Sequence, residues 1–283
     1  MKANGITSRM RSSHAARTVQ RHRAGAAVAD ERDDLAVEEP LEIRVESRPV
    51  AVTMRTPGHD DELAAGFLLT EGVVARREDI VAIAPAVSKK GGGAESNIVD
   101  VKLARPDSVD FARLTRHVFT ASSCGLCGKA TIAAVQAGTP ALAPGAGPGV
   151  PAATLAKMPA VLAAAQETFQ LTGGLHAAGL FSADGRLLVS REDVGRHNAV
   201  DKVLGHLLLA GACDPSETVL LVSGRVAFEI VQKALAARVA FIAAISAPTS
   251  LAVDFSRSNG QTLVGFLRDG RMNVYAGADR ITP

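Results

Sequence analysis

The second half of the chain alternates between strand-like and helix-like patterns of apolar residues. Continuous apolar runs at 219–222 and 239–245 are typical of strands buried on both faces. Over 196–211 the apolar positions recur at helical spacing instead: Val200, Val203, Leu204, Leu207 and Leu208. Strands and helices that alternate in this way predict right-handed crossovers and a largely parallel sheet with helices on both faces.

Turn residues add further elements to this half. A helix is predicted from Thr154 to the glycines at 173 and 174, and two strands are predicted around the turn Asp184–Gly185. We therefore assign residues 154–283 to a C-terminal α/β domain.

The first half has a different rhythm. Apolar and polar residues alternate on both sides of a turn within 41–54, which predicts a β-hairpin. Residues 56–72 open with turn residues and acids, as a helix N-terminus does, and Gly72 ends the apolar pattern. Another alternation at 96–104 predicts a strand. Residues 30–115 are thus expected to form a smaller α+β domain.

Two stretches show no periodicity. Residues 1–29 contain six Lys or Arg and no acid before Asp30, which predicts a disordered basic tail; an acidic patch follows at 30–39. Residues 138–152 are rich in Gly, Pro and Ala, as linkers are. We therefore expect 116–153 to be a mobile loop and linker between the domains.

Composition excludes several classes of function. Over 283 residues the net charge is +2, with no Trp and one Tyr, which argues against a nucleic-acid binder. No apolar run reaches the ~18 residues of a membrane helix, and no secretory signal is seen. With three cysteines, a reducing, cytoplasmic setting is the expectation.

Polar residues follow several predicted strands of the second half. In open α/β sheets, ligands bind beyond the carboxyl ends of the strands. Three loops qualify by this rule, at 223–225, 246–250 and 268–270, and "RHN" at 196–198 opens the predicted helix. Helix N-termini with free N–H groups suit an anion, so these segments predict a polar, partly cationic groove for phosphate or pyrophosphate.

Structural explanations exist for each of these residues. Ser223, Pro248 and Thr249 fit ordinary positions at the start of helices. Asp193 and Arg196 could form an ion pair that only stabilises the fold, and His176 fits a hydrogen-bonded strand residue better than a catalyst.

The two cysteines of "SSCGLCGKA", Cys124 and Cys127, form a CxxC pair. A structural zinc site needs four ligands. Cys213 lies far along the chain and His117 is the nearest histidine, seven residues before the pair, so a zinc site would need ligands from distant parts of the chain. A thioredoxin-like disulfide usually stands at a helix start after a strand, which is absent here. Transfer of sulfur as a persulfide needs a reactive cysteine on a flexible segment, and serine and glycine surround this pair. All three options stay open at this point.

Several motifs together resemble one family. "EEPLEIRV", "TMRTPGHDDELAAGFLLTEG", "SSCGLCG", "GGLHAAGLF", "REDVGRHNAVDKVLG", "SGRVAFEIVQKA", "SAPTSLAVDFS" and "TLVGFLRDGRMNVY" occur in the order seen in FdhD, the formate dehydrogenase accessory sulfurtransferases. The match spans roughly residues 38–275. The resemblance implies a C-terminal domain similar in fold to cytidine deaminases, although the zinc signature of those enzymes is not seen and no bound metal is implied.

The resemblance also implies a function. Such proteins accept sulfur from a cysteine desulfurase as a persulfide and deliver it to the molybdenum bis(molybdopterin guanine dinucleotide) cofactor of formate dehydrogenase. Cys124 would carry the persulfide, and Cys127 would assist or resolve it. A homodimer is implied as well. The alternative is a cofactor-binding chaperone with a structural or zinc-binding CxxC.

The family's cofactor-binding segment falls on "FLRDGR". Together with the groove predicted from the strand ends, the candidate cofactor-binding residues are Arg196, His197, Ser223, Gly224, Arg225, Phe266, Leu267, Arg268, Asp269, Gly270 and Arg271.

Overall fold

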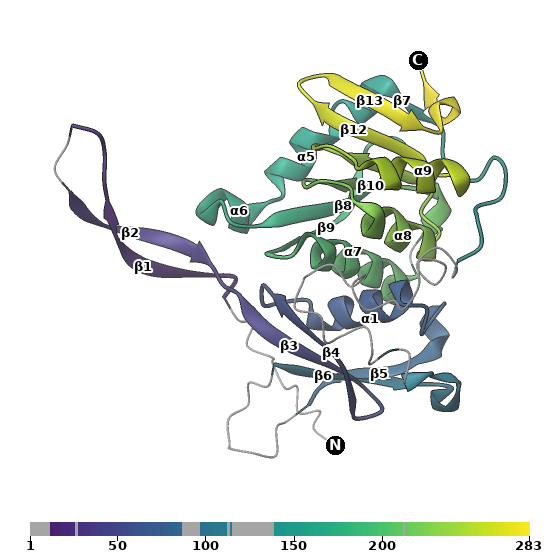
Figure 1. Ribbon diagram of the computed structural model, residues 1–283, viewed down its shortest axis with the longest axis horizontal. Coiled ribbons are helices and arrows are strands. Elements are labelled where there is room, and N and C mark those ends of the chain that lie inside the picture. The colour runs from purple at the N-terminus through teal and green to yellow at the C-terminus, as the bar shows by residue number, and fades with distance from the viewer. Residues whose placement is uncertain (1–11, 26–27, 87–96, 112–113, 115–138, 212) are drawn as a thin grey trace, which may run out of the picture.

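The computed structural model describes residues 12–25, 28–86, 97–111, 114, 139–211 and 213–283. These residues form a mixed α/β fold with an N-terminal domain, a larger C-terminal domain and a protruding β-hairpin (Figure 1). The α/β class predicted from the sequence is confirmed.

The N-terminal domain is a four-stranded sheet covered on one face by a helix (Figure 1). The strand order is β4-β3-β6-β5, and β3 runs parallel to β6, whereas the other neighbours are antiparallel. The elements are β3 (Glu39–Val45), β4 (Arg48–Arg55), α1 (Asp60–Thr70), β5 (Ile80–Pro85) and β6 (Ile98–Leu103). The predicted hairpin, helix and strand are all present, and β5 is an addition.

A six-stranded sheet in the order β13-β12-β11-β10-β8-β9 forms the centre of the C-terminal domain. Its strands are β8 (His176–Ser182), β9 (Leu187–Asp193), β10 (Thr218–Val222), β11 (Phe241–Ala244), β12 (Thr262–Arg268) and β13 (Arg271–Ala276). Only β10–β11 and β11–β12 are parallel; the other three pairs are antiparallel. The sheet is therefore mixed and not largely parallel as predicted. Tight turns make β8–β9 and β12–β13 antiparallel, and β10 also runs antiparallel to β8.

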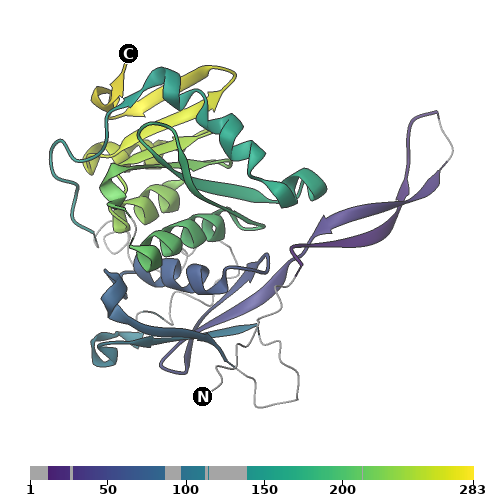
Figure 2. The same ribbon diagram turned by 180° about the vertical axis from the view of Figure 1, so that it is seen from behind.

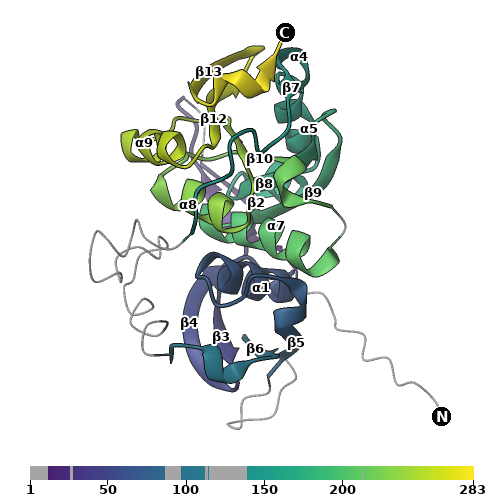
Figure 3. The same ribbon diagram turned by 90° about the vertical axis from the view of Figure 1, so that its right-hand side faces the viewer.

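Helices cover both faces of this sheet, as Figure 3 shows from the side. On one face lie α7 (Arg196–Ala210), α8 (Phe228–Ala236) and α9 (Ser250–Ser258), and on the other α4 (Ala152–Leu155) and α5 (Met158–Ala164), seen across the sheet in Figure 2. A short strand pair, β7 (Val150–Pro151) with β14 (Ile281–Thr282), joins the ends of the domain.

The single helix predicted from Thr154 is divided into α4, α5 and α6 (Glu167–Thr172). Pro159 stands near the N-terminus of α5 and has no N–H to continue an earlier helix. By contrast, α7 agrees with its predicted register, since Val200, Val203 and Leu204 are completely buried.

The predicted disordered tail instead contributes a strand. β1 (His14–Arg21) pairs antiparallel with β2 (Ala29–Ala36), and together they form an arm that projects from the molecule (Figure 1). The basic segment and the acidic patch are therefore two strands of one hairpin. Arg21 contacts both Glu31 at 3.2 Å and Asp33 at 3.6 Å, so opposite charges across the hairpin offset each other.

The base of this arm is attached beside α6. Ser13 and Thr168 hydroxyls lie 2.9 Å apart, and α6 is itself held by Glu192, whose carboxylate accepts hydrogen bonds from the backbone N–H groups of Thr168 and Phe169. The arm thus emerges from the side of the C-terminal domain where β8 begins.

The described part of the predicted linker is fixed rather than free. Leu142 and Val150 are 7% and 0% exposed, and Arg238 and Arg280 donate hydrogen bonds to the carbonyls of Pro140 and Ala146. Residues 139–153 therefore follow the surface of the C-terminal domain. Composition predicts a mobile linker here, because the share of Gly, Pro and Ala does not show that single residues such as Leu142 and Val150 are buried.

The two domains meet where α1 packs on α7 (Figure 3). At Gly66 an added Cβ would lie 1.8 Å from the carbonyl oxygen of Asp201, and at Gly205 it would lie 1.8 Å from that of Glu62. The backbones of α1 and α7 consequently touch, and one apolar core continues through both domains.

Candidate functional site at one edge of the C-terminal sheet

The predicted site residues gather at one edge of the six-stranded sheet. The strand pairings place the ends of β9, β10, β11 and β12 at this edge, together with the starts of β8 and β13. The same edge lies on the left of the C-terminal domain in Figure 1, on the side from which the arm projects. Loops far apart in sequence are thereby brought to a common surface.

Arg196 stands at the first position of α7, directly after Gly195, the helix N-cap residue. Its side chain lies near Gly224 and His176: a Cβ built on Gly224 would be 3.6 Å from Arg196 Cδ and 3.4 Å from His176 Nδ1. The buried Nε of Arg196 has no hydrogen-bond partner among the described residues. A buried guanidinium N–H without a partner is costly, and an anionic ligand would satisfy it.

His176 adds a neutral ring to this position. Burial lowers the pKa of His176, the nearby charge of Arg196 lowers it further, and Asp193 only partly opposes them. The imidazole is therefore uncharged at neutral pH, so the positive charge here comes from Arg196.

The two loops that follow β10 and β11 support each other through backbone hydrogen bonds. Val226 N–H donates to Ala247 C=O, and Thr249 N–H donates to Val226 C=O. Ser223 Oγ accepts a hydrogen bond from Ala177 N–H, and the Thr249 side chain caps α9. Thr249 thus has the capping position predicted for it, whereas Ser223 binds the backbone of β8 and does not cap α8, whose N-cap residue is Ala227. Arg225 is exposed at the same edge.

A pocket of about 230 Å³ lies at the other end of this edge, where β12 turns into β13. Its lining residues are Phe266, Arg268, Arg271 and Asn273. Phe266, Arg268 and Arg271 lie within the segment "FLRDGR", so the structure brings both arginines of that segment together around one pocket.

Local backbone geometry exposes these side chains. Asp269 and Gly270 both have positive φ, as the two-residue turn of a hairpin requires. The pairing of β12 with β13 shifts register between Gly265 and Arg268, and Phe266 has a φ of 51°. This irregularity turns Phe266 outward beside Arg268, whose guanidinium carbon lies 5.8 Å from the ring centroid.

Not every predicted residue belongs to this surface. Leu267 is completely buried in the core cluster with Met158, so only its backbone is left to take part in the predicted site. His197 is 4% exposed. Cys124 and Cys127 lie outside the described residues.

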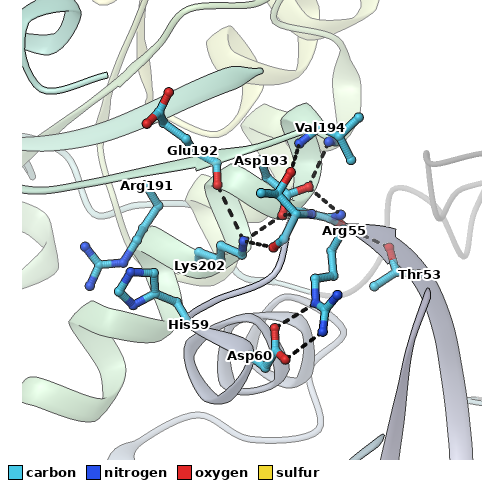
Figure 4. A network of polar contacts seen from close by, with 12 residues as sticks. Thr53, Arg55, His59, Asp60, Arg191, Glu192, Asp193, Val194 and Lys202 are labelled. Carbon is cyan, nitrogen blue, oxygen red and sulfur yellow. Dashed lines mark hydrogen bonds and ion pairs between the residues drawn. The ribbon is translucent and has the colours of Figure 1, made fainter. Parts of the chain in front are cut away.

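The ion pair proposed between Asp193 and Arg196 is also corrected. Asp193 instead pairs with Lys202, at 2.7 Å, and the two side chains are 0% and 1% exposed (Figure 4). Lys202 lies six residues beyond Arg196 in α7, so neighbouring positions in the sequence did not indicate that it would pair with Asp193. Thr56 of the N-terminal domain completes the cluster, a long-range contact with no local sequence signal.

Within the described ranges, no group of three or more His, Cys, Asp and Glu side chains is arranged to hold a metal ion. No helix in the same ranges combines the length and apolar character needed to cross a bilayer. Cys213 is an exposed residue, and the partial desolvation of its sulfur together with the charge of Asp214 raises the pKa of this thiol.

An α/β protein with a basic strand-end surface is the class that these observations define. The model of the FdhD/NarQ family matches residues 36–282, so the chain belongs to this family. A protein from Mycolicibacterium paratuberculosis named "Sulfur carrier protein FdhD" is 51% identical over 278 residues, 98% of this chain and 99% of that protein. One of the same name from Mycobacterium tuberculosis is 52% identical, covering 93% of this chain and 96% of the relative.

A solved structure is similar as well. A candidate formate dehydrogenase accessory protein from Desulfotalea psychrophila superimposes with a TM-score of 0.74 at 25% identity, covering 96% of this chain and 100% of that one. The similarity spans both domains, in agreement with the extent of the family match.

Proposed function

We propose that this chain is a cytoplasmic sulfur carrier that loads sulfur as a persulfide on Cys124 and delivers it to a molybdenum bis(molybdopterin guanine dinucleotide) cofactor for formate dehydrogenase. The name "sulfur carrier protein" of relatives about half identical in sequence supports the sulfur part of this proposal.

The observation that carries the cofactor part is the cationic strand-end edge. Arg196 with its unpartnered Nε stands at one position and the Arg268–Arg271 pocket at another. Arginine presents a planar fork of donors that matches phosphate oxygens, and a helix N-terminus adds free N–H groups. An aromatic ring such as that of Phe266 offers a face on which a flat base can stack. A dinucleotide with phosphates and guanines fits these features better than an apolar ligand does.

The sulfur steps balance without an external oxidant. The Cys124 thiolate attacks the outer sulfur of the desulfurase persulfide, an S–S bond forms on Cys124, and the desulfurase cysteine leaves as a thiolate. If Cys127 then attacks the inner sulfur, a Cys124–Cys127 disulfide forms and the outer sulfur leaves as sulfide, reduced by the two thiols. The molybdenum cofactor is the acceptor in this scheme and not a resident group of the protein.

Intact-mass spectrometry after incubation with a cysteine desulfurase and cysteine tests the proposal. The protein should gain one sulfur atom, Cys124→Ala should gain none, and Cys213→Ala should gain as much as the unaltered chain. Cys213 is the matched control because it is exposed but lies outside the CxxC pair. No gain of sulfur in the unaltered chain, with stoichiometric zinc by metal analysis, would overturn the proposal and favour the cofactor-binding chaperone instead.

A further inference from the structure

Thr56, the residue directly after β4 in the N-terminal domain, is 2% exposed and fixes the turn that precedes α7. Its hydroxyl accepts a hydrogen bond from Val194 N–H at 3.2 Å, and its own N–H donates to Asp193 Oδ2 at 3.2 Å. Its carbonyl accepts from Lys202 Nζ at 2.9 Å. The N–H, the carbonyl and the hydroxyl of this one residue thus all bind residues of the C-terminal domain.

The carboxylate of Asp193 accepts hydrogen bonds from four residues of both domains. Oδ2 binds Lys202 Nζ and Thr56 N–H, and Oδ1 accepts from Gly195 N–H at 2.8 Å and from Asn198 Nδ2 at 2.9 Å. The carboxylate is completely buried. A buried carboxylate whose acceptor positions are all used holds its donors in one arrangement.

The backbone held in this way is the one that presents Arg196. Gly195 lies between Asp193 and Arg196, and a Cβ built on it would be 2.8 Å from Asn198 Nδ2, so the turn closes tightly around its hydrogen bonds. Asn198 in turn donates to Met54 C=O at 2.7 Å, a second link to β4. The direction of Arg196 toward His176 and Gly224 therefore depends on residues of both domains.

We propose that Asp193 is a positioning residue: with Thr56 and Lys202 it fixes the first turn of α7, so that the N-terminal domain sets the affinity of Arg196 for an anionic group. This inference rests on the proposed function, in which Arg196 contacts the phosphates of a guanine nucleotide.

The same helix supplies a matched control. Asp201 is also buried and pairs with a lysine, Lys233, at 2.8 Å, and with a threonine of the N-terminal domain, Thr70, at 3.1 Å. Both clusters therefore consist of an aspartate, a lysine and a threonine across the junction. Asp201, however, holds the middle of α7 against α1 and α8, since the hydrogen bonds of its carboxylate go to Thr70 and Lys233.

The experiment measures the equilibrium affinity for GDP of the full chain and of Arg196→Ala, Asp193→Asn, Thr56→Val and Asp201→Asn, with the unfolding free energy of each. Arg196→Ala and Asp193→Asn should each weaken GDP binding about tenfold, which corresponds to ~1.4 kcal/mol. Thr56→Val should weaken it about threefold. Asp201→Asn should lose stability but keep its GDP affinity within about twofold.

A double variant distinguishes positioning from general loosening. Thr56→Val should lose almost nothing further once Arg196 is alanine, since both changes act on one interaction. If Asp193→Asn does not fold, Thr56→Val, which keeps the size of the side chain, provides the test with its Arg196→Ala partner.

Three results would overturn the inference. GDP affinity unchanged in Asp193→Asn and Thr56→Val, with Arg196→Ala weakened, would overturn positioning and leave the proposed function intact. An equal loss in Asp201→Asn would show an effect of stability alone. Unchanged affinity in Arg196→Ala would remove the basis for positioning, while the persulfide measurement on Cys124 would still decide the sulfur-carrier role.

Discussion

The domain junction and the β1–β2 arm both depend on pairs of opposite charge, but the pairs differ in burial. At the junction the side chains of Lys202 and Asp193 are 1% and 0% exposed, whereas in the arm those of Arg21 and Glu31 are 41% and 35% exposed. Breaking a buried pair leaves an uncompensated charge and costs about 3–5 kcal/mol, but an exposed pair is worth ~0–1 kcal/mol. The buried pair at the junction therefore fixes the position of α7 relative to the N-terminal domain. The exposed pairs of the arm mainly offset the repulsion that like charges within each strand would cause.

The largest effect is expected at the helix contact that keeps the junction closed. Gly205→Ala places a Cβ against the Glu62 carbonyl, where 1.8 Å is available, so α1 and α7 must separate. Alanine normally stabilises a helix relative to glycine by about 1 kcal/mol. Here we expect destabilisation of about 3 kcal/mol, at the upper end of the range for overpacking, measured by urea unfolding.

Gly149→Ala is the control for that substitution. An added Cβ there would meet only Thr282 Cγ2, at 3.8 Å, which is ordinary contact. Its unfolding free energy should stay within about 0.5 kcal/mol of the unaltered protein. A stable Gly205→Ala protein would mean that the helices do not approach as closely as described.

An intermediate effect is expected at Glu62, which joins α1 to β9 and α7. Arg191 donates to Glu62 at 2.5 and 2.6 Å, and His206 lies at 2.9 Å. Burial acts to raise the pKa of Glu62, but hydrogen bonds from Arg191 and His206 outweigh it and hold the pKa below its usual value. Glu62→Gln should therefore cost about 1.5–3 kcal/mol at neutral pH.

The pH dependence of that cost follows from the same shift. A carboxylate with a depressed pKa stabilises the folded state above its unfolded pKa of ~4.3 and loses that contribution as pH falls through its folded pKa. Stability measured from pH 6 downward should consequently converge for Glu62→Gln and the unaltered chain. Glu42→Gln, which breaks the more exposed Glu42–Arg44 pair, should cost less than ~1 kcal/mol; an equal cost would contradict the role of burial.

The smallest effect is expected in the arm. Arg21→Ala removes contacts with Glu31 and Asp33 and should change the unfolding free energy by less than about 0.5 kcal/mol, an amount that added salt abolishes. Arg32→Ala, at the exposed arginine of β2, is the comparison. A loss above 1 kcal/mol that persists in salt would show that the arm is held more tightly than its exposed pairs allow.

The features that could be predicted from the sequence are those set by neighbouring residues along the chain. The stripe of Val200, Val203 and Leu204 fixed the buried face of α7, and strand-end loops combined with the topology rule located the edge where Arg196 and Arg271 lie. Those features depend on periodicity and on turn residues, which are visible in a single sequence.

Long-range pairing accounts for what was missed. Asp193 pairs with Lys202 and Thr56, partners that proximity in sequence does not indicate. The need for glycine at positions 66 and 205 is visible only in the structure, where α1 and α7 cross. Leu267 is followed in sequence by polar residues, although its side chain is in the core. The arm was missed because its strands are stabilised by charges facing each other and not by an alternation of apolar residues.

The arm also determines where this chain can be shortened safely. A cut at Asp30, where the basic stretch gives way to acids, would delete β1 and leave β2 with its acidic side chains unopposed and a newly exposed backbone edge, a combination that invites wrong pairing between molecules. A cut after Val37 removes both strands and leaves β3 whole. For protein engineering β1 and β2 are therefore best kept or removed together, with the cut after Val37.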